Sequence, residues 1–472
     1  MLLNRRVRVA AAAEHHAIDE AALASPSAGA NKLLRVLGVG FGIAIVVGGT
    51  IGTGILRVPG PVAALLNDPA LIIAVWMASG IYVLLGVNTM AELATALPQA
   101  GGQYVYARRA YGGYGGFVMG WADWLIWVAA GSAMSVAFAE YVGKLLPVLA
   151  DHVGATAMST VAAFVLLHCT GVRGGSLAQQ ITSLLKVLAM ISFVVACFWL
   201  GDRATGSAAA AAPASAPSSG FLLIGSVLVA MQMVNESYAG WNSAVYFAEE
   251  DTDPGRNLPR AMFAGALVVI GVYVLINLAY LHVLPLDKFR ASTLPAADAI
   301  HAVFGGHAAQ FVYLLAALSL LAIINSVFMS APRVLYGLGR DGLFAPQAQR
   351  VSRGGTPVVA LLVTAAAVVI ALAFGKSFER LFLIAAFFGT SCDAAMAIAL
   401  FVLRRREPAL PRPYKAFAYP FAPLLFALIA SSVFVSFLIH DPPGSLFAIA
   451  VLAAGYPLYW WTLRKRRLAA KA

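Results

Sequence analysis

Residues 234–243 read VNESYAGWNS and lie at the centre of a long apolar run. The run enters this stretch as FLLIGSVLVAMQM and leaves it as AVYFAEED. If the run crosses a membrane, polar residues and a glycine at its centre indicate an interrupted helix. Backbone groups that are freed by an interruption are tolerated in a bilayer only where they face a cavity. The stretch therefore predicts a ligand cavity in the middle of a membrane protein.

The composition of the whole chain predicts a polytopic α-helical membrane protein. Of its 472 residues, 61% are hydrophobic and only 11% are charged, whereas soluble domains carry about 25% charged residues. Apolar stretches of about 20 residues recur along the chain, and each can cross a bilayer as a helix. A β-barrel would instead show short segments of alternating hydrophobicity. We place twelve spans at 38–66, 71–97, 113–143, 155–171, 177–200, 221–249, 259–284, 309–337, 357–375, 380–403, 418–439 and 445–463.

The basic residues predict how these spans are oriented. With a cytoplasmic N-terminus, the inward segments hold 24 Lys and Arg residues and the outward loops hold 6. This positive-inside bias places both termini in the cytoplasm, in a plasma membrane or a bacterial inner membrane. It also accounts for the net charge of +11 without a nucleic-acid partner. The bilayer and a small substrate are the expected partners.

Two polar segments flank the first group of spans. Residues 1–35 lack the apolar core of a signal peptide and are predicted to form a disordered cytosolic tail. Residues 202–220 are rich in Ala, Ser and Pro and are predicted to form an outward linker. The three cysteines all fall within predicted spans, so no disulfide-linked heavy chain is indicated.

The first predicted span contains a second interruption, VVGGTIGTGIL, at residues 46–56. Its four glycines weaken a helix by about 1 kcal/mol each relative to alanine. Close packing between helices would also account for them. However, interruptions in spans one and six lie five helices apart, as expected for two inverted five-helix repeats with a central transport site. Freed N–H groups suit a carboxylate and freed carbonyls suit an ammonium, so the pair predicts a site for a zwitterion such as an α-amino acid.

Four motifs, taken in order along the chain, resemble one family of permeases. They are GGTIGTGIL (48–56), AELATALPQAGGQYVYARRAYG (91–112), GWNSAVYFAEEDTDPGRNLPRAM (240–262) and NSVFMSAPRVLYGLGRDGLFAP (325–346). The sequence is similar to the amino acid–polyamine–organocation (APC) family, and SYAGWN with FAEE resembles its L-type amino acid transporter branch and bacterial relatives. The resemblance implies a LeuT-type fold with discontinuous first and sixth helices. Its parts would be inverted repeats at 36–201 and 221–404, then two peripheral helices and a cytosolic tail at 405–472.

The resemblance also implies where the substrate binds. Backbone N–H groups of the first break would hold the carboxylate, at Ile51, Gly52, Thr53 and Gly54. Backbone carbonyls of both breaks would hold the ammonium, at Thr50, Glu236, Ser237 and Ala239. Trp241 and Asn242 would pack against the helical half that follows the second break. Neither a cofactor nor a metal is implied, and no catalytic set is found, so the chain is predicted to be a transporter and not an enzyme.

Lys186 lies about ten residues into span five, near the middle of the membrane. Its amine could snorkel to the cytoplasmic interface. The family resemblance implies another role, in which a fixed cation braces the broken first helix and the eighth helix where sodium-coupled relatives bind Na⁺. We favour this role and predict transport without sodium. Whether Lys186 titrates, and whether the protein is an exchanger or a proton symporter, is left open.

Glu236 departs from the pattern of the L-type branch, where this position is apolar or aromatic. An intramembrane carboxylate indicates a functional role, and three are open: recognition of a cationic side chain or amine, a proton site, or pairing with Arg57.

Asp123 and Asp393 are further candidates that face the cavity, and each could equally be a hydrogen-bonded structural carboxylate. Glu92 and the loop EEDTDPGRNLPR are expected to pair with basic residues. The alternative functions are a polyamine or organocation permease and a non-transporting amino acid sensor.

Overall fold

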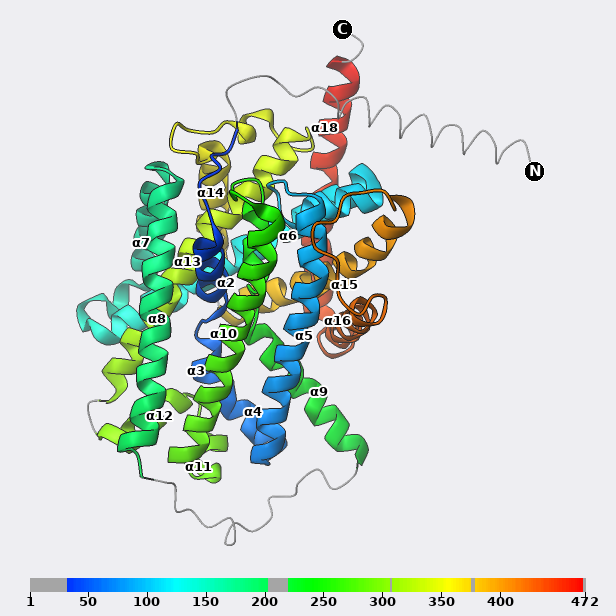
Figure 1. The fold of residues 1–472 in the computed structure, drawn as a ribbon. Helices are drawn as coiled ribbons and strands as arrows, with labels where there is room; N and C mark the ends of the chain where they lie inside the picture. The colour runs from blue at the N-terminus through cyan, green and yellow to red at the C-terminus, as the bar shows by residue number, and fades with distance from the viewer. Residues whose placement is uncertain (1–31, 203–219, 306–307, 375–377, 470–472) are drawn as a thin grey trace.

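The computed structural model describes residues 32–202, 220–305, 308–374 and 378–469. The predicted tail and linker therefore lie almost entirely outside the described residues. The described residues form a helical bundle (Figure 1). Its α-helices are α2 (Val39–Thr50), α3 (Gly54–Arg57), α4 (Pro59–Leu66), α5 (Pro69–Ala96), α6 (Gln103–Leu145), α7 (Val153–Cys169), α8 (Val172–Leu200), α9 (Gly220–Ser237), α10 (Pro254–Val283), α11 (Leu286–Ala291), α12 (Pro295–Phe304), α13 (Ala308–Arg340), α14 (Val358–Phe374), α15 (Phe378–Arg406), α16 (Phe421–His440), α17 (Pro442–Ala453) and α18 (Tyr456–Ala469). The 3₁₀ helices are η1 (Pro147–His152), η2 (Ser243–Phe247) and η3 (Pro346–Gln349).

Eight helical segments of the described chain are long and apolar enough to cross a membrane. They lie in α5, α6, α7 with η1, α8, α10, α13, α15 and α16. Shorter apolar helices occur at Val39–Thr50, Val358–Ala373 and Pro442–Ala453. The chain is thus a polytopic helical membrane protein, as its composition predicts.

The predicted twelfth span at 445–463 is not a single helix in the structure. The structure divides this stretch into α17 and α18, with the junction at residues 454–455. Gly455 lies against the ring of Trp121 in α6, and a Cβ atom at Gly455 would come within 2.8 Å of it. The close approach of the Gly455 backbone to this ring coincides with the interruption.

The first predicted interruption is present in the structure. Helix α2 ends at Thr50, and Ile51 adopts an extended conformation with φ −70° and ψ 106°. Helix α3 begins at Gly54 and runs through Val58 into α4. Figure 1 shows α2, α3 and α4 following one another through the middle of the bundle. The glycine-rich stretch therefore separates two helical halves in the interior of the protein.

The second predicted interruption is also present. Helix α9 ends at Ser237, and the chain continues through a turn into η2 at Ser243. Gly240 lies in this turn with φ +102°, a conformation that glycine adopts readily and other residues rarely. The polar stretch VNESYAGWNS is thus the point at which one helix stops and a short 3₁₀ helix starts.

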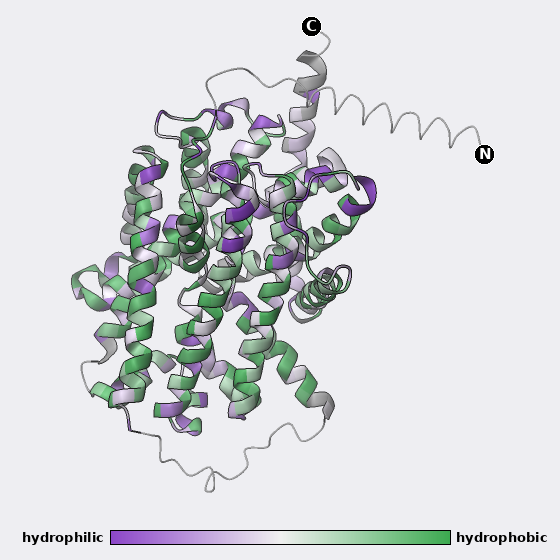
Figure 2. Ribbon diagram, in the orientation of Figure 1, coloured by the Kyte–Doolittle hydropathy of each residue, from purple (hydrophilic) through white to green (hydrophobic). Residues whose placement is uncertain are grey.

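The start of α2 and the end of α18 lie at the same end of the bundle (Figure 1). Hydrophobic residues fill the middle of the long helices, and hydrophilic residues gather toward the ends (Figure 2). Arg404, Arg405 and Arg406 lie in the last turn of α15. The shared location of the described ends agrees with the predicted topology. That this end faces the cytoplasm stays a prediction.

Ion pairs close this end of the bundle. In the predicted acidic loop, Glu249 pairs with Arg340 at 3.1 Å and Glu250 pairs with Arg333 at 2.6 Å. Asp341 pairs with both Arg340 and Arg108. Burial alone would raise the pKa of Asp341, but the neighbouring guanidinium groups of Arg340 and Arg108 hold it below its usual value. Asp341 is therefore ionised at neutral pH and contributes to this closure.

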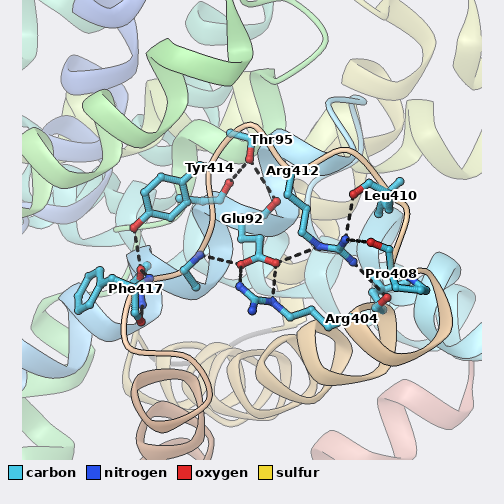
Figure 3. A network of polar contacts seen from close by, with 12 residues as sticks. Glu92, Thr95, Arg404, Pro408, Leu410, Arg412, Tyr414 and Phe417 are labelled. Carbon is cyan, nitrogen blue, oxygen red and sulfur yellow. Dashed lines mark hydrogen bonds and ion pairs between the residues drawn. The ribbon is translucent and has the colours of Figure 1, made fainter.

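Glu92 of α5 anchors a second polar network at this end (Figure 3). Its carboxylate pairs with Arg404 at 2.5 Å and Arg412 at 3.1 Å. It also accepts a hydrogen bond from the backbone N–H of Ala416 at 2.7 Å. The prediction that Glu92 pairs with basic residues is confirmed. The network ties α5 to the end of α15 and to the segment that precedes α16.

Candidate functional site

A cavity of about 260 Å³ lies between the two interrupted helices. Residues from both breaks line it, together with side chains from α5, α6, α13 and α15. Twelve of the fourteen site residues predicted from the sequence line this cavity: Thr50, Gly52, Thr53, Gly54, Arg57, Asp123, Glu236, Ser237, Ala239, Trp241, Asn242 and Asp393. The structure thus brings together residues that are up to about 340 positions apart in the sequence.

Ile51 is one of the two predicted residues that do not line the cavity. Its backbone N–H was expected to bind a substrate carboxylate. The structure contradicts this, because that N–H donates to the Val47 carbonyl at 3.0 Å and completes the last turn of α2. The residue is fully buried. The amides that could face a ligand therefore begin at Gly52.

Lys186 is the other predicted residue that does not line the cavity. It lies in α8 and contacts the backbone of the first break. Its ammonium donates to the carbonyl oxygens of Gly48 at 2.8 Å and Ile51 at 2.5 Å. Its side chain is fully buried, so it does not snorkel to an interface. A cation at the C-terminal end of α2 also offsets the negative end of the helix dipole.

The predicted link from span five to span eight is made by other residues. The amide of Asn325 in α13 donates to the Gln179 side-chain oxygen in α8 at 2.7 Å. The hydroxyl of Ser183, one turn before Lys186, donates to the Ala44 carbonyl at 2.8 Å. Helix α8 is thus joined to α2 by Ser183 and Lys186 and to α13 by Gln179.

One tyrosine joins the two breaks. The hydroxyl of Tyr273 in α10 lies 2.8 Å from the Ser237 carbonyl oxygen and 3.2 Å from the Thr50 carbonyl oxygen. Each carbonyl has a second lone pair that can still accept a ligand ammonium. Beyond the second break, Trp241 packs edge to face on Phe426 of α16. Trp241 therefore fixes this break against α16.

Gly240 is expected to tolerate no side chain. A Cβ atom there would lie 2.5 Å from the Gly49 carbonyl oxygen, and its left-handed conformation costs other residues about 1–2 kcal/mol. We expect Gly240→Ala to lower substrate uptake sharply, because it pushes the two breaks apart. Gly271→Ala in α10 is the matched control, since nothing lies within 4 Å of its Cβ position. Uptake per folded protein in proteoliposomes measures both, and equal uptake by the two variants would contradict this account.

The structure does not contain the ion pair that was considered for Glu236 and Arg57. Among the described residues, no salt bridge joins them. Arg57 Nε instead donates to the Tyr141 hydroxyl at 3.0 Å, and its guanidinium lies 5.3 Å from the centre of that ring. Tyr141 in α6 thus holds Arg57, and Glu236 faces the cavity. Recognition of a cation and proton binding remain the two roles of Glu236 to test.

Asp123 and Asp393 each line the cavity and each accept a hydrogen bond from a tyrosine. The Tyr246 hydroxyl donates to Asp123 Oδ1 at 2.6 Å. The Tyr82 hydroxyl donates to Asp393 Oδ2 at 3.0 Å. One oxygen of each carboxylate is therefore fixed by the protein.

Several lining residues were not predicted from the sequence. They are Tyr82, Gln103, Trp127, Tyr246, Ile323 and Thr390, among others. Gln103 follows Gly101 and Gly102, whose positive φ angles of 130° and 60° mark a turn in AGGQY. That pair of glycines was the available signal for Gln103. For the tyrosines no local pattern distinguishes a lining ring from a packed one.

Polar atoms at the cavity lack partners within the described protein. They are Thr50 Oγ1, Gln103 Oε1, Asp123 Oδ2, Trp127 Nε1 and both polar atoms of the Asn235 amide. Buried polar atoms are normally hydrogen-bonded, and each exception calls for an explanation. Their gathering around one cavity indicates a site for a polar ligand.

A polytopic helical protein with a polar cavity between two interrupted helices has the form of a secondary transporter. The chain belongs to the amino acid permease family, whose profile matches residues 42–463. This confirms the resemblance to the amino acid–polyamine–organocation family. Members of this family are transporters and not enzymes.

Relatives match over nearly the whole chain. The serine/threonine exchanger SteT of Bacillus subtilis is 28% identical over 93% of this chain and 98% of its own. The human large neutral amino acids transporter small subunit 2 is 27% identical over 93% of this chain and 83% of its own. The human Asc-type amino acid transporter 1 is 27% identical over 91% and 82%. The chain is therefore similar to transporters of amino acids from bacteria and mammals.

Proposed function

We propose that this protein is a sodium-independent secondary transporter that binds an α-amino acid at the paired breaks. The observation that carries the proposal is one cavity that residues of both breaks line, namely Gly52, Thr53 and Gly54 from the first and Glu236, Ser237 and residues 239–242 from the second. The amides of the first break would receive the substrate carboxylate. The carbonyls of Thr50 and Ser237 would receive its ammonium, alongside the Tyr273 hydroxyl.

The proposed architecture is a LeuT-type fold of twelve spans with both termini in the cytoplasm. Spans one to five and six to ten would be inverted repeats, so that α2–α4 corresponds to α9–η2. The position of each break in the first span of its proposed repeat supports this. Alternating access would then expose the cavity to one side of the membrane at a time. In this structure, the ion pairs of Glu249, Glu250 and Asp341 occupy the end that carries α18.

Transport is expected to continue unchanged when Na⁺ is replaced by choline. The reason is Lys186, whose ammonium already occupies the carbonyls of Gly48 and Ile51, where a coupling cation would otherwise sit. Uptake of a radiolabelled amino acid into proteoliposomes, in the two salts at equal ionic strength, is the measurement. A strict requirement for Na⁺ would overturn this part of the proposal.

Uptake into vesicles with and without an internal pool of amino acid distinguishes exchange from proton symport. SteT is named an exchanger, so we propose exchange and expect uptake to require an internal pool of amino acid at either of two external pH values. Uptake into empty vesicles that follows an imposed pH gradient would indicate symport. Binding of amino acids without flux under any condition would identify a sensor and refute transport.

A further inference from the structure

We propose that Asp123, Glu236 and Asp393 form a subsite for a second cationic group, so that the substrate is a dibasic amino acid. Its side chain would end in an ammonium or a guanidinium. This inference rests on the proposed function, because it assumes that the α-amino and α-carboxyl groups bind at the two breaks. It adds the chemistry of the side chain and assigns two further residues to its recognition.

The three carboxylates come from three separate elements and converge on one cavity. Asp123 belongs to α6, Glu236 to the end of α9 and Asp393 to α15. All three line the same cavity. No two of them are neighbours in the sequence, so their convergence is produced by the fold.

Positive charge on the protein does not balance them. Among the described residues that line the cavity, Arg57 alone is basic, and Tyr141 holds its guanidinium. Lys186 lies behind the first break, where it bonds two carbonyls. A buried carboxylate without a partner is strongly unfavourable, so such a group either takes a proton or gains a cationic partner. A ligand with an extra positive charge would offset that cost, and a neutral amino acid would not.

Asp123 gives an independent indication of a ligand. The residue is 1% exposed. Tyr246 fixes Oδ1, while Oδ2 has no hydrogen-bond partner in the described protein. The Gln103 backbone N–H also lies close to this carboxylate. An oxygen that is buried at a cavity without a partner is suited to accept a charge-assisted hydrogen bond from an ammonium or guanidinium.

The size of the cavity fits one small substrate. Its volume of about 260 Å³ lies just below the roughly 300–1,000 Å³ of sites for drug-sized ligands. Residues of both breaks line this cavity together with the carboxylates of Asp123 and Asp393. A linear amino acid can thus place its zwitterionic end at the breaks and its distal cation among the carboxylates.

The first test compares two ligands of similar shape on the unmodified protein. Lysine and norleucine share a linear side chain, but only lysine carries the distal ammonium. We expect the purified protein to bind lysine at least about tenfold more tightly than norleucine, as one favourable charged contact provides. Equal affinities would overturn the subsite. Because binding is measured directly, this result does not depend on whether the protein transports.

The second test removes the carboxylates one at a time. Asp123→Asn and Asp393→Asn are expected to weaken lysine binding about tenfold or more and to leave alanine binding within a factor of about two. Asp151→Asn in η1, on an exposed residue outside the cavity, is the control. Thermal unfolding shows whether each variant is folded. Equal loss of lysine and alanine binding by folded variants would identify the carboxylates as structural and refute the subsite.

Two further outcomes separate the inference from the proposed function. If the protein transports alanine but does not bind lysine, the proposed transport function stands and the proposal of a dibasic substrate is refuted. If the protein binds lysine tightly but transports no amino acid, the cation subsite stands and the proposed transport function is refuted. Preference for the diamine cadaverine over lysine would contradict the amino acid assignment, because it would show that the first break does not need a carboxylate.

Discussion

Replacing Lys186 with methionine is expected to reduce substrate uptake to a small fraction of the unmodified level. Methionine keeps an unbranched side chain but lacks the charge. The carbonyls of Gly48 and Ile51 would each lose a donor at 2.8 and 2.5 Å. Leaving one buried acceptor unsatisfied costs about 1–3 kcal/mol, so two can displace the end of α2. Since Gly49 and Thr50 line the cavity, that displacement would distort the site directly.

The control for this substitution is Lys288→Met. Lys288 lies in α11, is exposed and is distant from both breaks in the sequence. We expect its uptake to equal that of the unmodified protein. A folded Lys186→Met variant with normal uptake would refute the role of the cation at the first break. Partial recovery of Lys186→Met by Na⁺ would support it, because a small cation would then replace the ammonium at the same carbonyls.

The interruptions were the most predictable part of the fold. Four glycines in VVGGTIGTGIL and a polar stretch in VNESYAGWNS conflict locally with a continuous apolar helix, and such conflicts mark functional positions. Both helices stop there. The end of the chain was less predictable, because hydropathy records only that 445–463 is apolar. It does not reveal that the Gly455 backbone approaches Trp121 closely, where α17 gives way to α18.

The site was predictable where residues adjoin the breaks and unpredictable where distant helices supply them. Glu236 and the glycines were found because they interrupt a pattern. The partner of Arg57 was not, because Tyr141 is 84 residues away and a tyrosine among many aromatic residues gives no signal. The same holds for Tyr82 and Tyr246, which orient the carboxylates. The amide of Ile51 was assigned wrongly because the sequence does not show at which residue the last hydrogen bond of a helix is made.

Replacing Glu250 with glutamine is expected to be among the most destabilising conservative changes in the chain. Glu250 and Arg333 form a bidentate pair, with Nε–Oε1 at 2.6 Å and Nη2–Oε2 at 2.8 Å. Their side chains are 0% and 3% exposed. The Arg333 guanidinium also lies 4.6 Å from the Phe247 ring centre. Removing one member of a buried pair leaves an uncompensated charge, which costs about 3–5 kcal/mol.

The exposed pair of Asp253 and Arg256 supplies the control. These side chains are 55% and 78% exposed and 3.9 Å apart, so Asp253→Asn is expected to change the free energy of unfolding by at most about 1 kcal/mol. Thermal unfolding in one detergent compares the two variants. The double variant Glu250→Leu with Arg333→Met should regain much of the loss, because it removes both buried charges. If the double variant were less stable than Glu250→Gln, desolvation of the unpaired guanidinium would not be the cause. The pair would then stabilise the protein through its geometry between α13 and the segment that follows η2.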